Sequence, residues 1–261
     1  MARPLARTRG LLDGIPAPAA VAIATAWALA LAAQASGRSG LLSHDWLIEG
    51  GLPIADAFAI HLGAWQVMVV AMMLPTSLPL LRMFGTAADR QEHPDRAMAA
   101  LLGGYVIVWA LFGIAAFGAD VGLHAAIDAS APLASLEWAI GGLTLAAAGV
   151  FQFSSLKDAC LKQCRHPGVF LFRYYQRGSG GAVRLGVRHG VFCVGCCWAL
   201  MLIMFAVGVA NLLWMAVLTA IMVHEKTRPR GRDGVPVTGV ALLGAAAIVL
   251  PYSAYAAGVL G

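Results

Sequence analysis

Charged residues are scarce in this sequence of 261 residues. They make up 12% of it, whereas 60% of the residues are hydrophobic and the mean hydropathy is +0.77. Soluble domains carry about 25% charged residues. So little charge cannot cover a water-facing surface of this size, and lipid must therefore cover much of it. The composition excludes an ordinary soluble protein and speaks against nucleic acid as a partner, although the net charge is +5.

Familiar catalytic motifs are also lacking. The sequence contains no phosphate-binding loop, no pair of catalytic carboxylates and no Ser/His/Asp arrangement that we can recognise. Nothing indicates a hydrolase or an ATPase, and a non-enzymatic role is favoured. The cysteines number five, and an odd number argues against a closed disulfide framework.

Long apolar stretches predict an all-α, polytopic helical bundle in a membrane. A span needs about 20 apolar residues. The stretch from 191 to 223 is too long for one crossing, so we divide it at Gly208–Asn211, where Gly and Asn favour a turn. The seven predicted spans are Ala17–Ala35, Leu62–Leu81, Met98–Phe117, Leu136–Phe153, His189–Gly208, Ala210–Val223 and Val237–Val259. Residues 17–259 would form one transmembrane domain, preceded by a basic cytoplasmic segment, residues 1–16.

The distribution of Lys and Arg predicts the orientation. With the N-terminus inside and the C-terminus outside, only Arg38 of the 18 basic residues falls on the outer side. Glu225 and Lys226 are expected to end the sixth span and to form an interfacial pair there. A cleaved secretory signal ending near Ala35 is an alternative for the first span, and cleavage would leave six spans with the same orientation.

Cysteine and histidine gather at the two ends of the cytoplasmic loop 154–188. The clusters are Cys160-x3-Cys164-x-His166 and His189-x3-Cys193-x2-Cys196-Cys197. At about 100° per residue, the second cluster shares one face of a helix, and Met201 and Met204 continue that face toward the membrane centre. The short loop lets the first cluster fold back beside Cys193.

These side chains suit a soft metal ion. Thiolate and imidazole bind Cu(I) or Zn(II), and nearby thioethers favour Cu(I), with zinc as the alternative. Thiols on the cytoplasmic side stay reduced and free to bind metal. The predicted ligands are Cys160, Cys164, His189, Cys193, Cys196 and Cys197. The candidate relay groups are Met72, Met201, Met204 and His166.

Other interpretations stay open at this point. Free cysteine is a common small apolar residue of buried helices, and methionine in a span is ordinary packing. The same cysteines could belong to a membrane thiol–disulfide oxidoreductase, because Cys193 and Cys196 have the C-x-x-C spacing. The chain could also be a non-catalytic assembly subunit of a membrane complex.

Two segments carry a family resemblance. They are Gly149-Val-Phe-Gln-Phe-Ser-Ser-Leu-Lys-Asp-Ala-Cys160-Leu-Lys-Gln-Cys164-Arg-His-Pro167 and Gly186-Val-Arg-His189-Gly-Val-Phe-Cys193-Val-Gly-Cys196-Cys197-Trp-Ala-Leu-Met201. They resemble the CLxxCRxP and HGxxCxGCCWxLM motifs of the bacterial predicted metal-binding integral membrane proteins, a domain family of unknown function. The resemblance covers about residues 60–230, and Phe151 stands where that family has Tyr.

The resemblance implies metal binding in an integral membrane setting, in line with the copper handling associated with some members. We therefore expect a multi-pass protein of the bacterial inner membrane that acts in the acquisition, delivery or transport of a metal ion. Its expected partners are the lipid bilayer, the metal ion, and a metallochaperone or membrane metalloenzyme.

Overall fold

The computed structural model describes residues 16–37, 47, 50–207 and 211–259. All regular secondary structure within these ranges is helical, so the predicted all-α helical bundle is confirmed. The main helices are α1 (Ala17–Ala35), α3 (Ile54–Ala88), α4 (Pro94–Asp128), α6 (Ile140–Phe151), α7 (Ser155–Arg165), α8 (Pro167–Tyr174), α9 (Gly178–Val207), α10 (Leu212–Thr227) and α11 (Gly231–Ala256). Two short elements, α5 (Ala131–Ala134) and the 3-10 turn η2 (Glu137–Ala139), precede α6.

Five of the helices, α1, α3, α4, α9 and α11, are long and apolar enough to cross a membrane. The other two predicted spans are helical but shorter. The 12 residues of α6 extend about 18 Å and the 16 residues of α10 about 24 Å, against a hydrocarbon core of about 30 Å. A multi-pass membrane protein is supported, whereas the count of seven spans and the orientation stay predictions. The predicted turn at 208–211 lies outside the described residues except for Asn211, which caps the N-terminus of α10.

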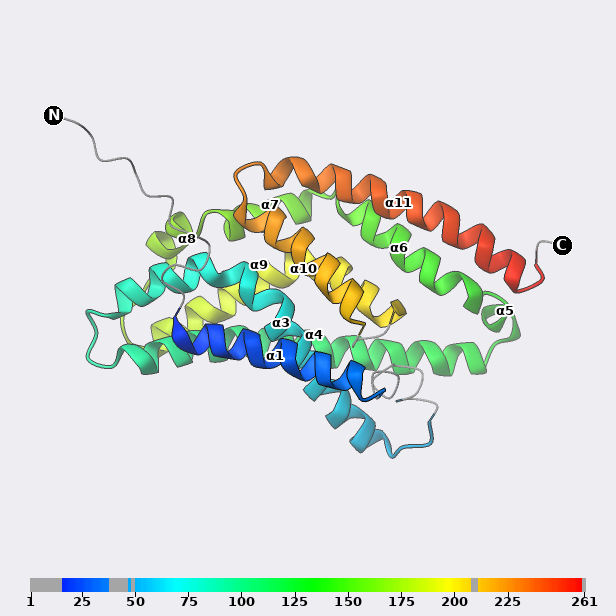
Figure 1. Cartoon of the computed structure of the whole chain (residues 1–261), viewed down its shortest axis with the longest axis horizontal. Helices are drawn as coiled ribbons and strands as arrows, with labels where there is room; N and C mark the ends of the chain where they lie inside the picture. The colour runs from blue at the N-terminus through cyan, green and yellow to red at the C-terminus, as the bar shows by residue number, and fades with distance from the viewer. Residues whose placement is uncertain (1–15, 38–46, 48–49, 208–210, 260–261) are drawn as a thin grey trace.

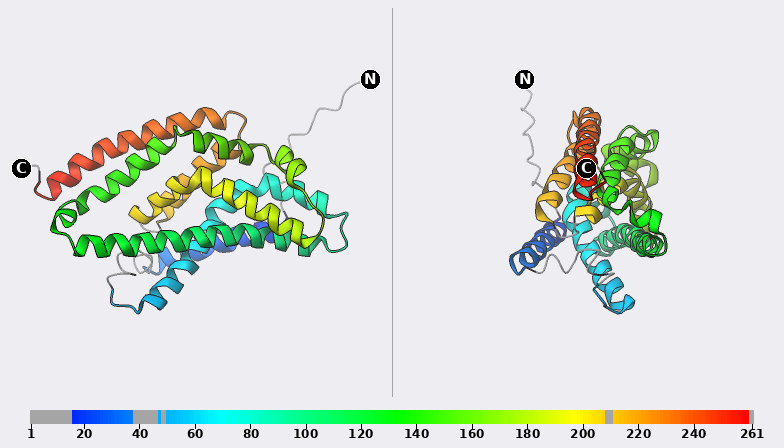
Figure 2. Two further views of the ribbon diagram at one scale, coloured as in Figure 1. Left: turned by 180° about the vertical axis from the view of Figure 1, so that it is seen from behind. Right: turned by 90° about the vertical axis from the view of Figure 1, so that its right-hand side faces the viewer.

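The helices form an elongated bundle (Figure 1). α4 packs along α9 and α6 along α11, while α10 contacts α3, α9 and α11. Both views in Figure 2 show α6 and α11 side by side at one flank. The turn between α3 and α4, the α7–α8 segment and the turn between α10 and α11 all lie toward one end of the bundle (Figure 1). The loops that carry most of the basic residues therefore lie together, as one membrane face requires.

Two glycines allow α4 and α9 to approach closely. A Cβ atom on Gly186 would overlap the carbonyl oxygen of Leu101, and one on Gly104 would overlap that of Val183. Small residues at such crossings let helix backbones meet in a membrane. This close crossing holds α9, the helix with most of the cysteines, firmly against α4.

Pro75 lies inside α3 and helps to dock α1. Proline has no N–H, so the carbonyl of Ala71 one turn earlier loses its helical donor. The indole N–H of Trp27 on α1 donates to that carbonyl at 3.1 Å. Just beyond Pro75, the hydroxyls of Thr76 and Ser77 bring polar atoms into the core.

Candidate metal centre

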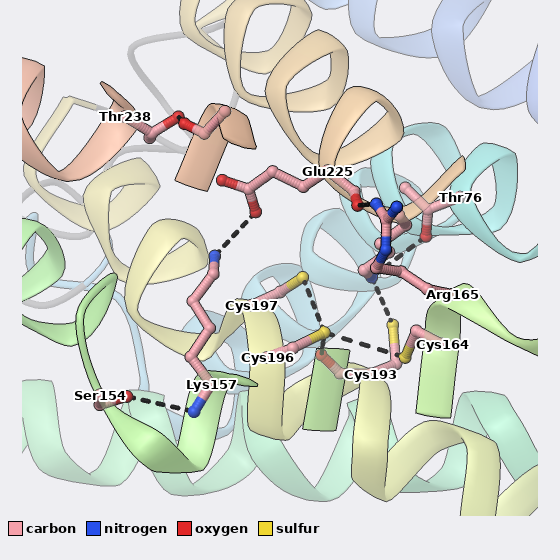
Figure 3. Close-up of polar contacts among 12 residues, drawn as sticks. Thr76, Ser154, Lys157, Cys164, Arg165, Cys193, Cys196, Cys197, Glu225 and Thr238 are labelled. Carbon is pink, nitrogen blue, oxygen red and sulfur yellow. Dashed lines mark hydrogen bonds and ion pairs between the residues drawn. The ribbon is translucent and has the colours of Figure 1, made fainter. Parts of the chain in front are cut away.

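Three cysteines share one face of α9, and that face lies inside the bundle rather than toward lipid. Cys193, Cys196 and Cys197 are at most 1% exposed. The sulfurs of Cys196 and Cys197 are 3.5 Å apart, and the thiol of Cys196 donates to the carbonyl oxygen of Cys193 at 3.3 Å. Adjacent turns of α9 therefore present thiols to a common buried space (Figure 3).

α7 adds a fourth cysteine to this group. Ser154 caps the helix by accepting a hydrogen bond from the Lys157 backbone N–H at 3.1 Å. α7 packs against α9, and Cys164 Sγ lies 3.9 Å from Cys196 Sγ (Figure 3). The loop folds back as the sequence predicts. We call Cys164, Cys193, Cys196 and Cys197 the sulfur cluster.

Cys160, also on α7, lies beside the sulfur cluster. Its side chain is buried, and a Cβ on Gly195 of α9 would come within 2.5 Å of its sulfur. Among the described residues, no hydrogen bond joins this sulfur to another side chain, and burial raises the pKa of the thiol. Cys160 therefore contacts the backbone of α9 through the space that Gly195 leaves.

Among the described residues, neither of the two predicted histidines has a hydrogen bond to a sulfur. His189 is buried, but its Nε2 is 2.9 Å from Ser77 Oγ and its ring stacks on Tyr105. The Tyr105 hydroxyl is 3.2 Å from Cys193 Sγ and 3.5 Å from Ser77 Oγ, so the hydrogen bonds among the described residues connect His189 to the sulfur cluster through Ser77 and Tyr105. His166 is exposed at the end of α7, where its Nδ1 is 2.8 Å from the Lys162 carbonyl oxygen.

The predicted methionines are packed in the core. Met72, Met201 and Met204 are fully buried in the same core cluster of side chains as the cysteines. Further buried methionines of this core cluster are Met68, Met73, Met215 and Met222. Thioethers from α3, α9 and α10 thus pack in the same core as the sulfur cluster.

Lys226 is a member of the site that the sequence analysis missed. Its Nζ lies 3.1 Å from Cys193 Sγ and 3.2 Å from Thr76 Oγ1, and 4.0 Å from Met73 Sδ. The side chain is 4% exposed. A buried ammonium group therefore touches the sulfur cluster directly.

The expected interfacial pair of Glu225 and Lys226 is wrong. Both residues are buried, and each contacts a different partner. Glu225 Oε2 accepts a hydrogen bond from Lys157 Nζ at 2.7 Å, and this ion pair joins α10 to α7 (Figure 3). Adjacent residues on a helix point about 100° apart, which directs the two side chains to different neighbours.

The sulfurs approach one another in pairs. In the described part of the chain, no three His, Cys, Asp or Glu side chains are grouped so that they could hold a metal ion. Two sulfurs that share an ion at about 2.3 Å each lie at most about 4.6 Å apart. The Cys164–Cys196 and Cys196–Cys197 separations of 3.9 and 3.5 Å meet that limit. Each pair could therefore share a soft ion between two sulfurs, whereas a structural Zn(II) site takes four ligands.

One comparison with known proteins gives a match. The model of a family described as PpoB2, copper chaperone, matches residues 62–249. No curated protein and no solved structure matches the chain. The matched range begins in α3 and ends in α11, so it contains all four residues of the sulfur cluster and also Lys226.

Proposed function

Because the chain belongs to the PpoB2 copper chaperone family, we propose that it takes up Cu(I) as cargo in the sulfur cluster and passes it to another protein. The match covers residues 62–249, well over half of the chain, and gives the copper-related role. The ligands, the oxidation state of the ion and the membrane setting are our inferences from the residues.

The observation that carries this proposal is the meeting of Cys164 and Cys196. Their sulfurs come from separate helices, 32 residues apart in the sequence, and lie 3.9 Å from each other. All five cysteines are free. Packing alone does not require thiols to face one another across a helix–helix contact. A shared ion gives a reason for this arrangement.

We place the sulfur cluster at the cytoplasmic end of a multi-pass protein of the bacterial inner membrane, with the N-terminus inside. The basic residues of the α3–α4, α7–α8 and α10–α11 segments support this orientation. The reducing cytoplasm keeps the thiols available for metal. A cytosolic metallochaperone that supplies copper, or a membrane metalloenzyme that receives it, is the kind of partner we expect.

The test is the copper content of protein purified in detergent under anaerobic, reducing conditions. Near-stoichiometric Cu(I) is expected for the unchanged chain, and none above background for the double variant Cys164→Ser/Cys196→Ser, because a hydroxyl is a poor ligand for a soft ion. Ala199→Ser is a matched control, since it adds a hydroxyl at another buried position of α9 and keeps every sulfur. Copper retained by the double variant would refute the proposed site.

A further inference from the structure

Lys226 is a cation held inside the core by three helices. It lies on the last turn of α10, and its Nζ contacts Thr76 of α3 and Cys193 of α9. Among the described residues, no carboxylate lies within ion-pair distance of it. The neighbouring Glu225 is paired with Lys157 instead. The contacts of the ammonium group are a thiol, a hydroxyl and a thioether.

A buried charge of this kind needs a partner. Removing an ammonium group from water costs several kcal/mol unless an opposite charge offsets it. Ionisable residues within membrane domains are accordingly rare and mark functional sites. The partner that the geometry offers Lys226 is Cys193 Sγ at 3.1 Å. The positive charge is therefore balanced when the sulfur cluster carries negative charge.

The charge of the bound ion decides whether the site is neutral. A monovalent ion held by two thiolates leaves one net negative charge, which the Lys226 ammonium cancels. A divalent ion held by the same two thiolates is already neutral, so the ammonium adds an unbalanced positive charge. Because the cysteines and Lys226 are buried, the neutral combination is favoured.

We propose that Lys226 is a specificity-determining residue, whose positive charge makes the sulfur cluster prefer a monovalent soft cation over a divalent one. The inference rests on the proposed function, because it concerns the same sulfur cluster. Among the described residues, Lys226 contacts Cys193, a member of the sulfur cluster, and makes no hydrogen bond to the proposed Cys164–Cys196 pair. Its contribution is the charge that it supplies beside the thiolates.

Three variants separate charge from hydrogen bonding. Lys226→Gln removes the charge and keeps an N–H donor for Cys193 and Thr76. Lys226→Arg keeps the charge. Thr76→Ala removes one hydrogen-bond partner of Lys226 and leaves its charge in place. Unfolding temperatures of the metal-free proteins check that each variant is folded.

The measurement is competition with a chelator, first for Cu(I) and then for Zn(II), on full-length protein in detergent. In Lys226→Gln, Cu(I) affinity should fall by about 10- to 100-fold, the usual effect of losing a group that supports metal ligands. Zn(II) affinity should hold or rise, so the preference for Cu(I) shrinks. Lys226→Arg and Thr76→Ala should keep the preference of the unchanged chain.

The outcomes distinguish this inference from the proposed function. If the unchanged chain binds Cu(I) and Lys226→Gln shows the same ratio of Cu(I) to Zn(II) affinity, the inference is wrong and the proposed function stands. An equal fall in both affinities would also overturn it, because a purely structural role weakens every ion alike. If the unchanged chain binds no Cu(I), the proposed function itself has failed.

Discussion

Lys157 and Lys226 are both buried, and they differ in what faces them. Lys157 is 1% exposed and lies 2.7 Å from a carboxylate oxygen of Glu225. Lys226 is 4% exposed and lies 3.1 Å from the thiol sulfur of Cys193. A carboxylate balances the first charge permanently, whereas a thiol balances the second only as a thiolate. The first lysine therefore joins two helices, and the second is the one whose charge we propose to act on the sulfur cluster.

Both buried lysines involve α10, because Lys226 lies on this helix and Lys157 pairs with its Glu225. Glu225 and Lys226 are consecutive residues of α10, so one turn of this helix contacts both the ion pair and the sulfur cluster. On the side of the ion pair, Arg165 adds hydrogen bonds from the end of α7 to the carbonyl oxygens of Glu225, Arg228 and Pro229. α7, which carries Cys164, is thus attached to the end of α10 by charged groups at both of its ends.

Breaking the ion pair should have the largest effect on stability. Lys157→Leu leaves Glu225 as an unpaired buried carboxylate, and we expect a loss of about 3–5 kcal/mol in the free energy of unfolding. The double variant Lys157→Leu/Glu225→Leu removes both charges and should recover much of that loss. Denaturant unfolding in detergent measures both.

Lys226→Gln sharpens the comparison in the same unfolding experiment. Without metal, its free energy of unfolding should fall much less than that of Lys157→Leu, because no carboxylate is left unpaired. Equal losses in the two variants would show that both lysines are structural, and a double variant no more stable than Lys157→Leu would contradict the ion pair as the cause.

Arg165 should have an intermediate effect, confined to α7. Hydrogen bonds from a charged donor contribute about 1.5–3 kcal/mol, and Arg165→Gln removes those that attach the end of α7 to α10. The expected result is faster alkylation of Cys164 in membrane vesicles, with Cys193 unchanged. Mass spectrometry of the labelled peptides measures both rates.

Lys162→Gln is the control for Arg165→Gln. It also removes a positive charge from α7, but its ion pair with Asp158 lies at the surface and contributes little. If Lys162→Gln exposed Cys164 as much as Arg165→Gln, the general charge of α7 would explain the effect, and its attachment to α10 would not.

The helices could be predicted well from the sequence. Backbone polar groups in lipid must be satisfied within the segment, so long apolar stretches become helices, and each of the seven stretches overlaps a different observed helix. The first predicted span, Ala17–Ala35, has the observed bounds of α1. The sequence predicts a loop over residues 154–188, where the structure has α7 and α8. The four-residue spacing of Cys160 and Cys164 was the available signal of a helix there.

The candidate site could be predicted in part. Helical periodicity placed Cys193, Cys196 and Cys197 on one face, because that depends only on residues of α9. The partner of His189 could not be predicted in the same way, since Ser77 lies on another helix. Lys226 was missed for a similar reason. Its sequence neighbour Glu225 suggested a local pair, and only the packing of α3, α7 and α9 around α10 decides which partner each side chain reaches.

Ser77 should have the smallest effect, and it tests the hydrogen bonds that lead to Cys193 through Tyr105. Ser77→Ala removes the partner of His189 Nε2, 2.9 Å away, and we expect a loss of about 0.6 kcal/mol, the average for hydrogen bonds between membrane helices. Copper content should be unchanged, because Ser77 contacts the sulfur cluster only through Tyr105. A loss of copper in this variant would mean that the position of His189 matters to the ion, and that the predicted imidazole ligand belongs in the site beside the cysteines.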